Sequence, residues 1–172
     1  MKNEFRHKIV IIICWYGNWP WYFKYFLHSV KFNPSIDFII VTDEPLSEEL
    51  PKNVKLIPKS LEDIREIATQ KMGFDVSLSS AYKLCDFKPA YGEIFNEYIK
   101  DYDFWGHGDI DMIFGNIRNF IETNILDTYD VISVHSMFQF SKNITFLKNL
   151  KNNILIYSKI SIFYFYKNHK KL

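Results

Sequence analysis

The chain has 172 residues, the size of one domain, and its 48% hydrophobic and 24% charged residues exclude intrinsic disorder as a description of the whole. The formal net charge of +1 points to no particular partner, but the charges are unevenly distributed. All 20 acidic residues lie at or before Asp130, whereas residues 135–172 contain only basic charges. We therefore expect two segments, a body over 1–134 and a basic, aromatic tail over 135–172.

Apolar runs alternate with helical patterns along the body of the chain. In chain order, the patterns predict a strand at 8–14, a helix at about 20–30, strands at 37–42 and 53–57, a helix at 60–72, helical structure late in 83–100, a strand at 102–105, a helix at 116–126 and a strand at 130–134. The runs at 8–14 and 37–42 are rich in β-branched residues, which is typical of strands buried on both faces. This alternation predicts an α/β fold with a mostly parallel sheet flanked by helices.

The helix predicted at 60–72 has recognisable ends. Ser60, with Asp63 three residues later, forms a capping-box pattern in which Asp replaces the more usual Glu. Gly73 follows the last helical residue and suits a left-handed cap.

The two cysteines, Cys14 and Cys85, are too few for a disulfide scaffold or a cysteine-based zinc site. Their apolar neighbours predict buried free thiols. The apolar stretch at 9–15 has no small-residue cleavage site after it, which argues against a signal peptide. The longest apolar run, 154–166, is too short for a transmembrane helix and is interrupted by Lys159. These features fit a cytoplasmic protein.

The segment 107–111, with the sequence HGDID, follows a predicted strand. Residues i and i+2 of an extended segment point the same way, so Asp109 and Asp111 would converge. Two converging carboxylates repel each other unless a cation lies between them, and hard oxygen ligands suit Mg²⁺ or Mn²⁺. Gly106 and Gly108 would let the backbone approach a ligand closely. The pattern predicts a metal–phosphate site, and the alternative is a surface turn rich in Gly and Asp.

Other candidate residues follow the first two strands or share a helical face. Ligands of parallel sheets gather at the carboxyl ends of the strands, where Tyr16, Gly17 and Asp43 lie. Asp43 would accept hydrogen bonds from a ribose or a base, or else cap a turn. Lys83 and Asp86 share one face of a helix, where the alternative is a surface ion pair.

Several common motifs are missing from the sequence. There is no P-loop, no G-x-G-x-x-G fingerprint and no G-x-S-x-G elbow. The tail interleaves lysines with aromatic residues, as single-strand nucleic-acid binders do, but it contains no Arg and the body is acidic. We expect no nucleic-acid partner.

Four stretches of the chain together resemble a family of bacterial glycosyltransferase-like proteins. The family was long described as a domain of unknown function and is typically encoded among polysaccharide-biosynthesis genes. The stretches are 8–17 (KIVIIICWYG), 37–43 (DFIIVTD), 80–95 (SAYKLCDFKPAYGEIF) and 102–115 (YDFWGHGDIDMIFG). The resemblance covers about residues 8–134. The chain looks similar to the GT-A group of glycosyltransferases, whose members use a D-x-D motif to hold a divalent metal on a nucleotide-sugar diphosphate.

The resemblance implies a GT-A-like fold and a metal-dependent glycosyltransferase that acts on a cell-surface polysaccharide or glycan precursor. It implies Mn²⁺ or Mg²⁺ as cofactor, a nucleotide-sugar donor (a UDP-sugar is favoured) and a glycan or lipid-linked acceptor. It identifies no catalytic residue. The resemblance implies that Asp111 binds the metal directly and that Asp109 contacts the ribose or the metal. It also implies that Tyr16 and Gly17 border the base and that Asp43 lies near the nucleoside. Lys83 and Asp86 would lie against the nucleotide.

The tail departs from this family pattern, which stops near Val134. Family members usually run well beyond 172 residues, and the part after the D-x-D motif normally supplies the acceptor pocket and often a further metal ligand. We therefore expect a C-terminally truncated or frame-disrupted glycosyltransferase with an incomplete sheet. Alternatively, the tail is genuine and lies on the anionic inner face of a membrane.

Three other functions fit parts of the sequence. The first is an inactive remnant that binds nucleotide-sugar without turning it over. The second is an interaction protein that binds a membrane or nucleic acid through its basic tail. The third is a metal-dependent phosphohydrolase, which usually needs a nucleophilic Asp on the first strand, where this chain has Cys14, Trp15 and Tyr16.

Overall fold

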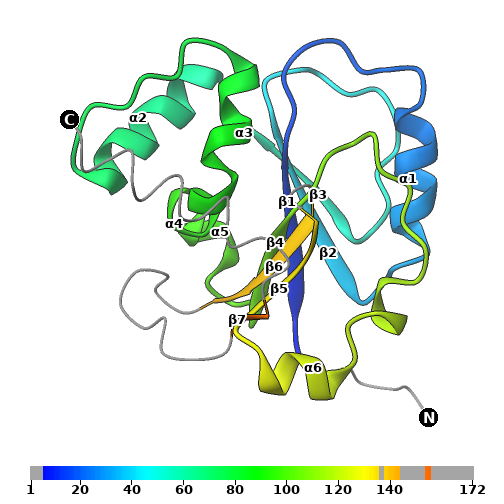
Figure 1. Ribbon diagram of the computed structural model, residues 1–172. Helices are drawn as coiled ribbons and strands as arrows, with labels where there is room; N and C mark the ends of the chain where they lie inside the picture. The colour runs from blue at the N-terminus through cyan, green and yellow to red at the C-terminus, as the bar shows by residue number, and fades with distance from the viewer. Residues whose placement is uncertain (1–5, 136–137, 144–153, 156–172) are drawn as a thin grey trace.

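The computed structural model describes residues 6–135, 138–143 and 154–155, which form one sheet with helices on both faces (Figure 1). The strands are β1 (Ile9–Cys14), β2 (Ile36–Thr42), β3 (Val54–Pro58), β4 (Phe104–His107), β5 (Val131–His135), β6 (Phe138–Lys142) and β7 (Ile154–Leu155). The α-helices are α1 (Phe23–Lys31), α2 (Leu61–Met72), α3 (Leu84–Phe87), α4 (Tyr91–Ile94), α5 (Asn96–Ile99) and α6 (Thr123–Thr128). Short 3₁₀ helices are η1 (Ala81–Lys83), η2 (Lys88–Ala90) and η3 (Ile117–Asn119).

The order of the strands in the sheet is β3-β2-β1-β4-β6-β5-β7. β1 pairs in parallel with both β2 and β4, β2 with β3, and β5 with β7. β6 runs antiparallel to both of its neighbours, β4 and β5. The prediction of an α/β fold with a mostly parallel sheet is therefore confirmed. The chain moves outward from β1 to β3 and then returns to place β4 on the other side of β1, so the strand order reverses between β1 and β4. In open α/β sheets the ligand crevice lies at such a switch point, at the carboxyl ends of the strands.

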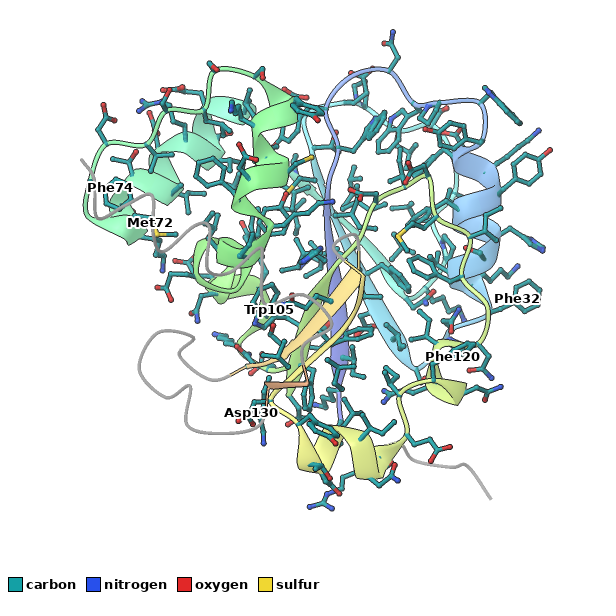
Figure 2. All side chains as sticks on the ribbon, in the orientation of Figure 1. Phe32, Met72, Phe74, Trp105, Phe120 and Asp130 are labelled. Carbon is teal, nitrogen blue, oxygen red and sulfur yellow. The ribbon has the colours of Figure 1, made fainter. Side chains whose placement is uncertain are left out.

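The two faces of the sheet bury separate apolar clusters, because successive strand residues point to opposite faces. Helix α1 and the segment that contains η3 and α6 cover one face, and α2 to α5 cover the other (Figure 1). Trp105 is fully buried on the second face, between the sheet and α4 (Figure 2). Phe32 and Phe120 lie on the outside of the first face and are exposed (Figure 2).

The predicted ends of α2 are confirmed. The Ser60 hydroxyl accepts a hydrogen bond from the Asp63 backbone amide at 3.1 Å, and the Asp63 carboxylate accepts one from the Ser60 amide at 2.7 Å. Gly73 adopts a φ of 76°, in the left-handed region that favours glycine.

Two predicted helices are broken in the structure. The helix expected in the later part of 83–100 is divided into α4 and α5, and the short pieces α3 and η2 precede it. Pro89 lies in η2 and has no amide hydrogen to donate, and Gly92 packs directly against the Trp105 ring, where a side chain would not fit. The helix expected at 116–126 divides into η3 and α6 because Glu122 is extended.

Two smaller predictions are wrong. Cys85 is exposed rather than buried, whereas Cys14 is partly buried. Gly106 does not bring the backbone close to a ligand, because β6 occupies that side of β4: an added Cβ would lie 2.5 Å from the Gln139 backbone oxygen.

The described part of the tail belongs to the sheet. β6 lies between β4 and β5, and its Phe140 and Ser141 are buried. The remaining tail residues, including those expected to contact a membrane, lie outside the described residues apart from β7. Within the described ranges, no helix is long and apolar enough to cross a bilayer.

Candidate functional site

The candidate site lies at the switch point, where β1 and β4 end side by side. Ile12 of β1 is level with His107 of β4, and the Gly108 amide donates to the Ile12 carbonyl at 3.3 Å. Residues 15–17, which follow β1, and residues 108–111, which follow β4, therefore leave the same edge of the sheet. This arrangement agrees with the expected position of the D-x-D segment beside the end of the first strand.

Asp109 is paired with a lysine from the α2–α5 side of the sheet. The Lys88 Nζ lies 2.7 Å from Oδ1 and 2.6 Å from Oδ2 of Asp109. The side chains are 13% and 33% exposed, so both charges are partly removed from water. Lys88 was not among the predicted site residues. No local pattern could have indicated the pair, since its members are 21 residues apart.

Asp109 and Asp111 lie in different environments. Asp109 is half-buried against Lys88, whereas Asp111 is exposed and has no ion pair to any residue that the structure describes. Ile110, between them, is 2% exposed and packs into the core on the α1 face. The same described ranges contain no group of three or more His, Cys, Asp or Glu side chains placed to hold a metal ion.

His107, the last residue of β4, is near this pair and is only 4% exposed. Burial, together with the smaller effect of the nearby Lys88 charge, lowers the pKa of His107 to about 4, and Asp109 opposes this change. The ring is therefore neutral at pH 7. Its Nδ1 is buried and has no hydrogen-bond partner within the described part of the chain. Buried polar atoms usually have a hydrogen-bond partner. This nitrogen is therefore available to form a hydrogen bond with a ligand or a water molecule.

The other titratable groups around the pair are also neutral. The Cys14 thiol and the Tyr91 hydroxyl share a hydrogen bond, and the hydroxyl donates to the Leu84 carbonyl at 3.2 Å. Burial raises the pKa of Cys14 to about 12 and raises the pKa of Tyr91 well above its usual value. Neither group supplies an anionic nucleophile near pH 7. The buried part of the site thus holds one ion pair beside neutral side chains, and the exposed Asp111 follows it in the chain.

The remaining predicted residues lie around the same edge or on the nearby helices. Gly17 is exposed with a φ of 109°, which a side chain would strain. The Tyr16 hydroxyl donates to the Lys59 carbonyl at 3.0 Å. Burial raises the pKa of Tyr16, with further contributions from Cys14 and Asp43, so the exposed Asp43 is close to this ring.

Lys83 and Asp86 form an exposed ion pair with each other at 3.3 Å. This geometry is that of a surface ion pair, which was the alternative to a nucleotide contact for these two residues. Their contact with a nucleotide stays a prediction.

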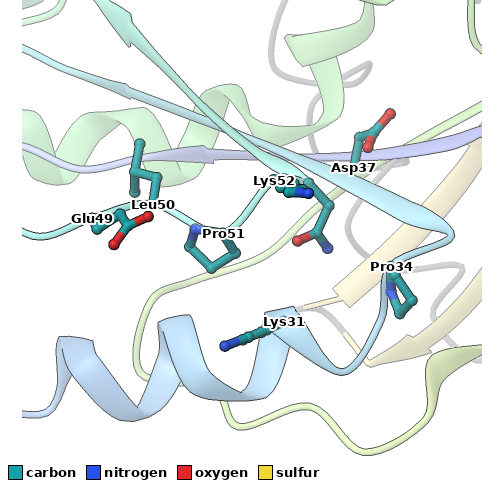
Figure 3. A pocket seen from close by; sticks show the side chains of 8 residues that line it. Lys31, Pro34, Asp37, Glu49, Leu50, Pro51 and Lys52 are labelled. Atoms are coloured by element: carbon teal, nitrogen blue, oxygen red, sulfur yellow. The ribbon is translucent and has the colours of Figure 1, made fainter.

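A hollow of about 620 Å³ lies at the opposite edge of the sheet (Figure 3). It is lined by Lys31, Pro34, Asp37, Glu49, Leu50, Pro51, Lys52 and Asn53, which lie near the amino ends of β2 and β3. It contains none of the predicted site residues. We therefore place the candidate site at the switch point, where the ion pair and the unpaired nitrogen are.

We expect buried His107 to make stability depend on pH. Its pKa in the folded protein is below the value of about 6.5 in an unfolded chain, so the unfolded state binds the extra proton first. The contribution of His107 to the free energy of unfolding is fully present above about pH 6.5. It falls by up to about 1.4 kcal/mol per pH unit as the pH drops toward 4. Urea unfolding at pH 7.5, 6.5 and 5 measures this slope.

The variant His107→Gln should lose less stability than the wild type between pH 6.5 and 5. His28→Gln is the matched control, because His28 is exposed on α1 and should leave the slope unchanged. Equal slopes for His107→Gln and the wild type would show that another group carries the pH dependence.

Comparison with known proteins gives a family match and distant structural similarities. The family described as "Family of unknown function (DUF6625)" matches residues 11–168. The match continues past Val134 into the tail, where we expected the family pattern to stop. No curated protein matches the chain.

Among solved structures, the galactosyltransferase LgtC, in complex with donor and acceptor sugar analogues, is similar with a TM-score of 0.39 and 16% sequence identity. The match covers 71% of this chain and 45% of the LgtC chain, so this chain spans less than half the length of that protein.

Proposed function

The chain belongs to the DUF6625 family, whose function is unknown, and we propose that it is a glycosyltransferase that uses a nucleotide-sugar donor. The observation that carries the proposal is the Lys88–Asp109 ion pair at the carboxyl ends of β1 and β4, near His107, whose Nδ1 has no partner among the described residues. A switch point of this kind is where nucleotides bind in open α/β sheets. The sugar-transfer chemistry comes from the sequence resemblance to GT-A proteins.

The donor would lie along the edge of the sheet. Tyr16 and Gly17 would border the base, Asp43 would accept hydrogen bonds from the nucleoside, and the diphosphate would lie beside the ion pair. During transfer, the bond between the sugar carbon and the phosphate oxygen breaks as the oxygen of an acceptor hydroxyl bonds to that carbon. The nucleoside diphosphate leaves, and the hydroxyl proton passes to solvent. The site must stabilise the charge of the departing diphosphate. A glycan or lipid-linked acceptor at the cytoplasmic face of the membrane belongs to the same proposal.

The residues present fit a divalent metal poorly. The resemblance implies Mn²⁺ or Mg²⁺ between Asp109 and Asp111, but Lys88 engages both carboxylate oxygens of Asp109. Asp111 is the one other carboxylate of the motif, and the structure as described brings no third ligand to it. We therefore assign no step of the reaction to a metal.

Calorimetric titration with UDP and GDP, with and without Mn²⁺, tests the donor site. We expect at least one of these nucleotides to bind, and Asp43→Ala to weaken it by about tenfold, the effect of losing one hydrogen bond to a charged group. Asp75→Ala is the control, because its side chain is 89% exposed and lies beyond α2. Binding that Asp43→Ala retains would remove Asp43 from the site.

The absence of binding by UDP and GDP under all conditions would contradict the proposed function. A second assay would measure nucleotide release from UDP- and GDP-sugars. Tight binding without any release, in the presence of candidate acceptors, would favour the alternative of a protein that binds nucleotide-sugar without catalysis.

A further inference from the structure

We propose that Lys88 is the cation that binds the donor diphosphate, and that Asp109 holds Lys88 in place while the site is empty. This inference rests on the proposed function and specifies how its site neutralises the diphosphate. It predicts that nucleoside diphosphates bind without a divalent metal.

The first step is the position of the ammonium group. Lysine is rarely as buried as Lys88 unless it is paired, and here both oxygens of one carboxylate lie within hydrogen-bond distance of it. A partly buried charge that lost its partner would be costly, so the two residues keep each other satisfied in the empty site. His107, Cys14 and Tyr91 are neutral around them and do not compete for Lys88.

The second step is an exchange of partners. A diphosphate that enters at the carboxyl ends of β1 and β4 offers oxygen atoms to the Lys88 ammonium, which forms strong charge-assisted hydrogen bonds with phosphate. Asp109 is then free to accept hydrogen bonds from the ribose hydroxyls, the contact that the sequence resemblance implies for it. Both charged residues have a partner before and after binding. A divalent ion on Asp109, by contrast, would have to displace Lys88 and leave it without its carboxylate.

Titration of UDP and GDP in the presence of EDTA tests the inference. We expect the wild type to bind at least one of them, Lys88→Met to weaken that binding by at least about tenfold, and Lys88→Arg to retain part of it. Asp111→Asn should bind at least as tightly as the wild type, because no metal is involved and the variant removes a negative charge. Lys100→Met is the matched control, since Lys100 is exposed at the end of α5 and should leave binding unchanged.

The outcomes separate the inference from the proposed function. Binding that requires Mn²⁺, is lost in Asp111→Asn and survives in Lys88→Met would overturn the inference and leave the proposed function intact. No binding by the wild type with or without Mn²⁺ would overturn both. Because Lys88→Met leaves Asp109 unpaired, the double variant Lys88→Met/Asp109→Asn serves as a second test. It removes both charges, and retention of wild-type affinity in this folded variant would also overturn the inference.

Discussion

Replacing Gly106 with alanine is expected to destabilise the protein by about 3 kcal/mol or more, at the upper end of the usual cost of overpacking a core. Gly106 of β4 is directly opposite Phe140 of β6. An added Cβ would lie 2.5 Å from the backbone oxygen of Gln139 and 2.9 Å from the Phe140 ring. The ring can rotate, but the backbone oxygen is part of the pairing between β4 and β6. The methyl group would therefore push β6 away from β4.

Thermal and urea unfolding measure the loss. Gly115→Ala is the matched control, because Gly115 is exposed, has no atom within 4 Å of an added Cβ and does not have a positive φ. We expect this control to stay within about 0.5 kcal/mol of the wild type, as surface substitutions usually do. If Gly106→Ala were equally mild, the close packing of β4 on β6 would be disproved.

The features that could be predicted from the sequence are those encoded by neighbouring residues. The β-branched runs of β1 and β2 and the capping box at Ser60 each depend on residues within one element. The position of Asp109 beside the end of β1 was also predictable, because parallel strands end at the same edge of a sheet.

The features that were missed depend on contacts between distant segments. Lys88 begins η2, directly after α3, and its Nζ meets Asp109, which follows β4 and is 21 residues further along the chain. β6 was missed because it begins the tail, whose composition differs from that of the body. β6 lies antiparallel between β4 and β5, so Gly106 contacts β6 rather than the ligand that the sequence had suggested.

The expected consequence of these contacts for function is that the charge at the site is controlled by a residue outside the D-x-D motif. With Asp109 neutralised by Lys88, only the exposed Asp111 carries an uncompensated charge within the motif. An incoming diphosphate therefore meets one isolated carboxylate rather than two. This reduces the repulsion that a metal would otherwise have to overcome.

Asn33→Ala is expected to cost about 3 kcal/mol, because it removes the link between α1 and the segment that follows Asp111. The Asn33 side chain is 3% exposed. Its amide donates to the Ser29 and Gly115 carbonyls at 3.2 and 2.9 Å, and its Oδ1 accepts from the Ile117 amide at 2.9 Å. Truncation takes the acceptor away from the buried Ile117 amide, at about 1–3 kcal/mol for an unsatisfied buried group, and it also removes the bond to the Gly115 carbonyl.

In a chain of this length, that loss corresponds to a fall in Tm of roughly 6–12 °C. Hydrogen exchange should rise at residues 115–117, because their anchor to α1 is gone, whereas the exchange of β1 should change less. Asn119→Ala, at an exposed position two residues beyond Ile117, should leave both measurements at the wild-type values. If Asn33→Ala lowered Tm but weakened UDP or GDP binding no more than Asn119→Ala does, the anchor would stabilise the fold without positioning the D-x-D segment. Weaker nucleotide binding in the folded variant would show that α1 sets the position of the Asp109–Asp111 turn.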